Sequence, residues 1–296
     1  MAEWSTISDD PNDPAVLRAR QAEIDAARHP QIPDRVPFIL DRVRGKRVLD
    51  IGCVQHTVEA EEADNWLHRH VVNAATSCVG VDIHSDGVLA LQAKGYDVVD
   101  HDLLSGPGPL AERGPFDVIV CGELIEHLPD PQALLSVTSQ LLAPGGEIIL
   151  TTPNPYAPRR TAAGARLHMW ENADHATYLF PSGIAHMASR AGLKLSVTTT
   201  LTPPAFFGQL LTSLRVAGPL GRLASLLGPL GRGPARRLTA LSRRSPIPIG
   251  VLLSLRSVWS TGMVGETAVY VLEHDPAAPS AAMNQVQQER EPAPTA

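Results

Sequence analysis

The 296-residue chain contains few aromatic residues, few lysines and few cysteines. Aromatic side chains make up 4% of the sequence, which argues against a broad stacking surface for nucleic acid bases. The net charge of −6 argues against binding to a phosphate backbone, so no DNA partner is expected. The cysteines at positions 53, 78 and 121 have neither metal-ligand nor disulfide spacing, so we expect free thiols in a reducing compartment.

Long hydrophobic runs are also missing. No stretch of about 18 apolar residues is free of both charge and proline, so a membrane-spanning helix is not expected. The first residues contain no basic stretch followed by an apolar one, which predicts a cytoplasmic protein. Hydrophobic residues nevertheless form 44% of the chain, which is enough for a sizeable core.

Short apolar runs alternate with helical patterns along the chain. Runs rich in Val and Ile are typical of strands buried on both faces of a parallel sheet, and they occupy residues 47–52, 78–82, 96–99, 116–121, 146–152, 193–197 and 268–272. Helical patterns cover residues 14–29, 35–43, 63–75, 86–94, 131–142 and 182–191. This alternation predicts an α/β fold with a doubly wound, mostly parallel, seven-stranded sheet.

The polar, proline-containing ends of the chain set the expected domain limits. We expect one domain over residues 14–275, with disordered ends at 1–13 and 276–296. Residues 201–265 hold eight arginines without lysine or acid, which predicts a helical insertion before the last strand. Two interpretations stay open: a lid that contacts the acceptor or an anionic membrane surface, and a cap whose arginines face water or the acidic body.

Acidic residues end two neighbouring strands of the expected sheet. Asp50 is followed by Ile51-Gly52-Cys53, and Asp82 is followed by Ile83. A glycine lets a ligand approach the backbone, and a carboxylate at the next strand accepts hydrogen bonds from ribose hydroxyls. Together with the runs at 116–128 and 141–154, this order resembles the class I S-adenosylmethionine-dependent methyltransferases, over about residues 46–200 and 266–273.

The resemblance implies S-adenosylmethionine as cofactor and assigns residues to each part of it. Asp50 and Gly52, with Cys53, would lie near the methionine moiety, with Asp50 toward its amino group, directly or through water. Asp82 would bind the ribose hydroxyls. The remaining cofactor contacts would be Ile83 beside the adenine, Asp102 and Leu103 at the adenine amino group, and Cys121 and Gly122 at the opening to the sulfonium. Asp102 has a second interpretation as a turn acid or helix N-cap.

The glycine motif of this family is incomplete here. Its second and third glycines are replaced by Val54 and His56, and a segment over about residues 54–72 lengthens the loop. We expect a rearranged loop that still binds the cofactor. The histidines and acids of this segment are interpreted as a solvated helix face. A dehydrogenase is disfavoured because the glycine spacing that cradles phosphates is absent.

A second motif, Glu123-x-x-Glu126-His127, follows the fourth expected strand. On a helix these three side chains share one face. Similar runs occur in metal-dependent members, including small-RNA 2′-O-methyltransferases and quinone-ring O-methyltransferases, and His175 would be the fourth ligand. Three interpretations stay open: a Mg²⁺ or Mn²⁺ site, a metal-free site in which Glu126, His127 and His175 are catalytic, and a structural turn.

These features predict an O-methyltransferase. The expected acceptor is a small molecule or a glycan: a hydroxyl of a sugar, a glycolipid or a secondary metabolite, or a phenolic hydroxyl. One alternative is a small-RNA 2′-O-methyltransferase, against which the acidic core and the scarcity of aromatic residues count. The other is a non-catalytic protein that acts at a membrane surface and keeps the methyltransferase fold. The sequence does not indicate an oligomeric state.

Overall fold

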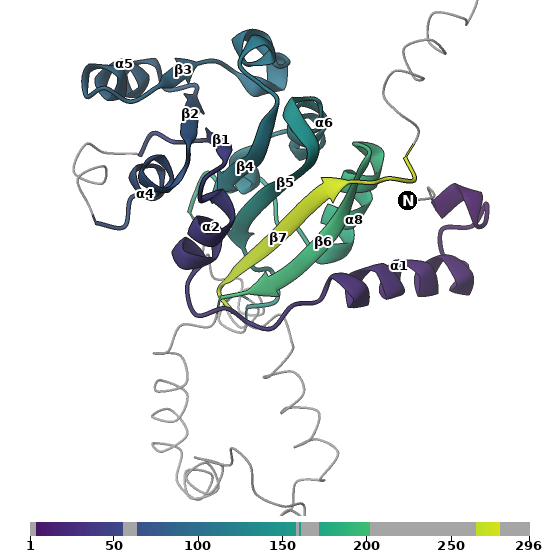
Figure 1. The fold of residues 1–296 in the computed structure, drawn as a ribbon. Helices are drawn as coiled ribbons and strands as arrows, with labels where there is room; N and C mark the ends of the chain where they lie inside the picture. The colour runs from purple at the N-terminus through teal and green to yellow at the C-terminus, as the bar shows by residue number, and fades with distance from the viewer. Residues whose placement is uncertain (1–3, 56–63, 158–159, 161–171, 202–264, 279–296) are drawn as a thin grey trace, which may run out of the picture.

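The computed structural model describes residues 4–55, 64–157, 160, 172–201 and 265–278 (Figure 1). Seven strands form one sheet in the order β3-β2-β1-β4-β5-β7-β6. Neighbouring strands from β3 to β5 are parallel, whereas β7 runs antiparallel to both β5 and β6. The expected doubly wound α/β sheet is therefore confirmed. The strands are β1 Arg47–Ile51, β2 Ser77–Asp82, β3 Val98–Asp100, β4 Phe116–Gly122, β5 Leu142–Pro153, β6 Leu193–Thr200 and β7 Thr267–His274.

Helices cover both faces of this sheet (Figure 1). The α-helices are α1 Pro14–Ala27, α2 Arg35–Val43, α4 Leu67–Ala74, α5 Ser85–Ala93, α6 Pro131–Leu141 and α8 Pro181–Arg190. Short 3-10 turns are η1 Trp4–Thr6, η2 Leu103–Ser105, η3 Gly108–Glu112 and η4 Ile125–His127. Aspartates begin three of the helices: Asp13, Asp34 and Asp130 each accept a hydrogen bond from a backbone N–H of the first turn.

Alternate residues of each central strand enter two different cores. In β4, Val118 and Val120 pack with α2 and α4, whereas Ile119 and Cys121 pack with α6 and α8. This alternation follows from the two-residue period of a strand, and it explains why the strands are apolar throughout. A third, smaller cluster joins α5 to β3 and to the residues after β1. Because β1, β2 and β4 are parallel, their C-terminal ends meet at one edge of the sheet.

Several expected boundaries need correction. The helix expected over 63–75 begins at Leu67, and the helix expected to open at Glu123 is a 3-10 turn that begins only at Ile125. Residues 4–13 have a described path that includes η1. The expected insertion lies outside the described residues except at its ends, 201 and 265, and so does the tail from 279. In the described parts, no helix is long and apolar enough to traverse a membrane.

Candidate active site

The turn after β1 strongly favours glycine. Gly52 has φ +73°, a left-handed conformation that side chains rarely adopt, and its N–H donates to the Val81 carbonyl at 2.9 Å. A Cβ at this position would lie 3.0 Å from a methyl group of Leu124. The backbone conformation and the contact with Leu124 explain the glycine here, whereas its expected role, close approach of the backbone to a ligand, stays a prediction.

Asp82 lies at the end of β2, as expected, and holds the loop after β1. Its Oδ2 accepts a hydrogen bond from the Val54 N–H at 2.9 Å, and its Oδ1 accepts one from the His84 N–H at 3.0 Å. The next residue, Ile83, leaves 70% of its surface exposed at this edge. An exposed apolar side chain beside a carboxylate suits an adenosine, whose base is apolar on its faces and whose sugar carries a diol.

The valine in the glycine motif is accommodated by another glycine. Gly87 lies in the first turn of α5, and a Cβ added there would overlap Cγ1 of Val54. The N–H of Gly87 also donates to Nδ1 of His84 at 3.0 Å, which caps the N-terminus of α5. The extra side chain at position 54 is thus accommodated by α5. Cofactor binding by the expected rearranged loop stays a prediction.

A pocket opens at the C-terminal edge of β1 and β4. Four of its lining residues are among the expected cofactor contacts: Asp50, Gly52, Cys53 and Gly122. The others come from α2, from β1 and from the longer loop and α4: Arg35, Ile51, Gln55, Trp66, Leu67 and His68. The motif residues therefore face the same space, and an additional set of side chains completes its wall.

His68 belongs to this wall, and its solvated interpretation is wrong. The side chain is buried, and its Nδ1 lies 2.8 Å from Oδ2 of Asp50. Trp66, also buried, donates from its indole Nε1 to the Cys53 carbonyl at 3.0 Å. The segment after β1 thus holds two cofactor-motif residues in place through buried hydrogen bonds.

The remaining expected cofactor contacts do not line this pocket: Asp82, Ile83, Asp102, Leu103 and Cys121. Asp102 caps η2 by accepting from the Leu104 N–H at 2.9 Å, which bears out its turn-acid interpretation. The side chains of Leu103 and Cys121 are buried in the core shared with α6. Burial raises the pKa of the Cys121 thiol far above its usual range. Only the neighbouring Gly122 therefore faces the pocket from β4.

The second motif is not a helical face. Glu123 has φ +54° and is the one non-glycine residue with a left-handed backbone in the described part of the chain. Such a conformation costs roughly 1–2 kcal/mol and is found where the surroundings hold it. Here Oε1 of Glu123 lies 3.4 Å from Nη1 of Arg35, which also donates to Oγ1 of Thr151 at 3.1 Å. Glu123 therefore faces α2 instead of its expected partners.

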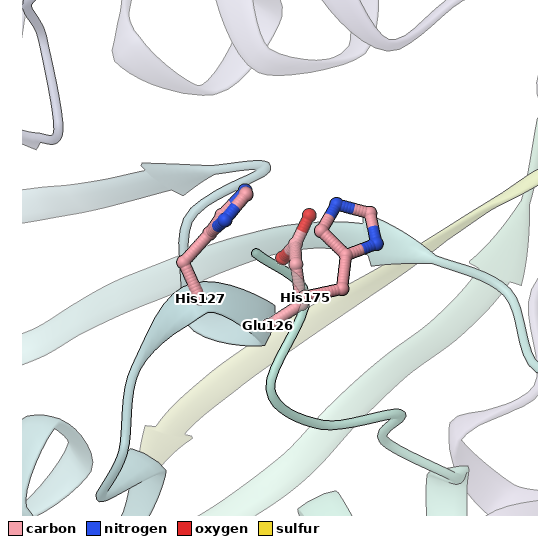
Figure 2. Close-up of side chains that lie close together, drawn as sticks. All are labelled: Glu126, His127 and His175. Carbon is pink, nitrogen blue, oxygen red and sulfur yellow. The ribbon is translucent and has the colours of Figure 1, made fainter. Parts of the chain in front are cut away.

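Glu126, His127 and His175 do converge, as Figure 2 shows. One ligand atom of each residue lies within 4.8 Å of those of the other two. The centroids of the two imidazole rings are 4.8 Å apart, and the rings are in a T-shaped arrangement. The Glu126 carbonyl accepts hydrogen bonds from the N–H groups of Ala176 and Thr177, which holds the segment after His175 against η4. His127 extends outward, with Nδ1 3.1 Å from the Asp174 carboxylate.

Glu126 is an unusually basic carboxylate. Burial, followed by the negative charge of Glu123, raises its pKa from 4.5 to about 7. Its Oε2 accepts a hydrogen bond from Thr152 Oγ1 at 2.9 Å, whereas Oε1 is buried without a hydrogen-bond partner among the described residues. A carboxylate with a pKa near neutrality can accept a proton from a hydroxyl, which is the property a general base needs.

The donor atoms of this three-residue cluster are also suitable ligands for a metal ion. The carboxylate oxygen Oε1 of Glu126 has no competing partner in the described part of the chain, and Asp174 can orient the His127 ring from behind. Glu123 lies outside the cluster, so the expected four-ligand set is reduced to three. Two imidazoles and one carboxylate fit Mn²⁺ or another transition ion better than Mg²⁺, which prefers oxygen ligands.

This fold is that of an α/β methyltransferase. A family model described as a methyltransferase domain matches residues 24–197, and the chain belongs to that family. A ubiquinone biosynthesis O-methyltransferase of Thiobacillus denitrificans is 28% identical over 190 residues, which cover 61% of this chain and 76% of that protein. A protein of the same name from Chromobacterium violaceum is 31% identical over 176 residues, or 55% and 72% of the two chains.

Among solved structures, an S-adenosylmethionine-dependent methyltransferase from Archaeoglobus fulgidus aligns with 80% of this chain and 90% of its own, at 16% identity and a TM-score of 0.49. The family match and the sheet order identify this chain as a class I S-adenosylmethionine-dependent methyltransferase.

Sequence reasoning missed four residues of these sites: Arg35, His68, Thr152 and Asp174. Two of them had a local signal: Asp174 precedes His175, and His68 lies among the histidines and acids of residues 54–72. Arg35 lies on a helix before the first motif, and Thr152 lies in a strand whose sequence is typical of a buried core strand. Their roles depend on the sheet order, which brings β5 and α2 beside β4.

Proposed function

We propose that this chain is an O-methyltransferase, which moves the methyl group of S-adenosylmethionine to an acceptor hydroxyl. The observation that carries the proposal is the cluster of Glu126, His127 and His175 beside the cofactor pocket. Arg35 lies within electrostatic reach of both, because it lines the pocket and its positive charge acts on the Glu126 carboxylate. The names of the two relatives above, both O-methyltransferases, support transfer to oxygen.

The reaction is an in-line displacement at the methyl carbon. The bond from carbon to the acceptor oxygen forms while the bond to sulfur breaks, and S-adenosylhomocysteine leaves. The acceptor proton passes to Glu126, whose pKa of about 7 leaves a substantial fraction ionised at neutral pH. The histidines on either side of Glu126 orient the hydroxyl through hydrogen bonds, and most of the rate comes from such positioning.

A divalent ion, Mn²⁺ in preference to Mg²⁺, is proposed as an aid at the same cluster. Glu126, His127 and His175 would hold it, and when bound it would lower the pKa of the acceptor hydroxyl. Chelation followed by re-addition tests this part. We expect activity to fall after chelation and to return more fully with Mn²⁺ than with Mg²⁺. Full activity after chelation would mean that no metal ion takes part and that Glu126 accepts the proton without one.

The proposed acceptor is a hydroxyl on a secondary metabolite, with a sugar or glycolipid hydroxyl as the second candidate. Tyr156 and Phe180 support an acceptor with a flat face, because their exposed rings pack edge to face 5.2 Å apart, after β5 and before α8. Aromatic rings of this kind stack on phenolic rings and also on the apolar faces of sugars. Contact of residues 201–265 with an anionic membrane stays a prediction from sequence.

A methylation screen with labelled S-adenosylmethionine tests the proposal. Purified protein is offered phenolic, polyketide, sugar and glycolipid acceptors, and the methylated atom is located by mass spectrometry and NMR. We expect O-methyl products, which Glu126→Gln abolishes while cofactor binding is kept. Methylation of carbon or nitrogen alone would contradict the proposal.

A further inference from the structure

We propose that His68 is a positioning residue for the cofactor, which holds the Asp50 carboxylate in the orientation that binds the α-ammonium group of S-adenosylmethionine. The proposal rests on the methyltransferase activity and on the expected contact of Asp50 with that group. It does not depend on the acceptor. The family motif supplies Asp50, whereas His68 comes from the segment that departs from the motif.

The contact between these residues is direct and buried. Nδ1 of His68 lies 2.8 Å from Oδ2 of Asp50, and the two side chains are 1% and 5% exposed. A carboxylate only accepts hydrogen bonds, so the imidazole donates from Nδ1. With Oδ2 held in this way, Oδ1 is the oxygen that can face a ligand. Both side chains line the same pocket, so the constrained carboxylate lies where the cofactor is expected.

Packing fixes the imidazole ring on several sides. The ring centroid is 5.5 Å from that of Trp66 and 5.5 Å from that of Tyr96. Gly80 of β2 makes room for it, because a Cβ there would lie 2.9 Å from Cε1 of His68. A ring held in this way has little freedom to rotate, so the direction of its Nδ1–H, and with it the plane of the Asp50 carboxylate, is set by the fold.

The other ring nitrogen argues against a role in packing alone. Nε2 of His68 is buried without a hydrogen-bond partner among the described residues. A buried polar atom without a partner destabilises a fold by roughly 1–3 kcal/mol, and an apolar side chain would fill the same space without that cost. The one polar contact that the imidazole makes there is with Asp50. The histidine is therefore explained by what it does to that carboxylate.

Matched substitutions can separate this role from a structural one. Asn places its amide N–H near the position of Nδ1, whereas Gln places it near Nε2. We expect His68→Asn to bind S-adenosylmethionine within about threefold of the unmodified protein, and His68→Gln to bind it roughly tenfold more weakly, the effect of one hydrogen bond to a charged group. Dissociation constants come from calorimetry, and circular dichroism melts establish that both variants are folded.

A truncated ligand makes the test specific. 5′-Methylthioadenosine lacks the amino acid part of the cofactor, so its affinity should be the same in both variants and in the unmodified protein. In addition, His68→Gln should weaken cofactor binding no further once Asp50→Asn is present, because both changes remove one interaction. Equal losses for both ligands, or independent effects in the double variant, would overturn the proposal.

Failure of the unmodified protein to bind S-adenosylmethionine would contradict the methyltransferase activity itself. Normal binding by the unmodified protein together with normal binding by His68→Gln would contradict only the role of His68. The two failures are therefore distinct.

Discussion

Replacement of Glu126 by Gln is expected to stabilise the metal-free protein above neutral pH while it abolishes methyl transfer. Burial and the charge of Glu123 raise the pKa of Glu126 from 4.5 to about 7. The folded state therefore binds a proton at this site more tightly than the unfolded state does. The resulting stabilisation is fully present below pH 4.5 and is lost as the pH rises through about 7.

The size of the effect follows from the same values. A shift of about 2.5 pH units between 4.5 and about 7 corresponds to roughly 3 kcal/mol of unfolding free energy, as an upper figure. Gln carries no charge at any pH, so the variant avoids this loss. Its side-chain oxygen can still accept the hydrogen bond that Thr152 donates to Glu126 at 2.9 Å. The gain should consequently be large at pH 8 and small at pH 5.

Urea unfolding in the presence of a chelator measures this difference. The unmodified protein and Glu126→Gln are compared at pH 5 and pH 8, with Glu112→Gln as a control at an exposed glutamate of η3. We expect the advantage of Glu126→Gln over the unmodified protein to grow by about 1–3 kcal/mol between the two pH values, and that of the control to stay constant. Parallel curves for all three proteins would refute the argument for a basic, buried Glu126.

Three further predictions follow from the cofactor side of the molecule. Asp82→Ala should weaken S-adenosylmethionine binding at least tenfold in calorimetry, because it removes the expected ribose acceptor; unchanged affinity would place the ribose elsewhere. Gly87→Ala should lower the melting temperature, and Val54→Ala in the same chain should restore it, since the added Cβ overlaps the Val54 side chain. Cys53 and Cys121 should resist iodoacetamide at pH 8 until the protein is unfolded, because burial raises the pKa of both thiols; fast labelling of the folded protein would contradict that burial.

The sheet was predictable from sequence because its strands are buried on both faces. Runs such as Val118 to Cys121 must be apolar at every position, since alternate residues enter different cores. Acid and glycine residues then mark where these strands end, so Asp50, Gly52 and Asp82 could be assigned to one edge. Boundaries were less accurate where local turns decide them, as at α4.

The second motif was misjudged for a physical reason. The spacing of Glu123, Glu126 and His127 fits one helical face, and nothing in the local sequence distinguishes that from a turn. The ion pair with Arg35, together with the left-handed backbone of Glu123, directs this carboxylate toward α2. Residues distant in the chain thus decided which members of the motif meet, and the metal-ligand set changed accordingly.

The departures from the glycine motif show why a broken motif does not by itself indicate a lost site. Val54 would obstruct the loop if its neighbours were unchanged, but α5 carries a glycine where the valine packs. The backbone N–H of Val54 donates a hydrogen bond to Asp82, so the loop is held by the residue that is expected to bind the ribose. These replacements act through contacts between β1, β2 and α5, which the three-dimensional arrangement reveals and a linear motif omits. A cofactor site judged by motif alone would be scored as defective here, whereas the hydrogen bond from the Val54 N–H to Asp82 and the space left at Gly87 show how the neighbours of this loop accommodate the valine.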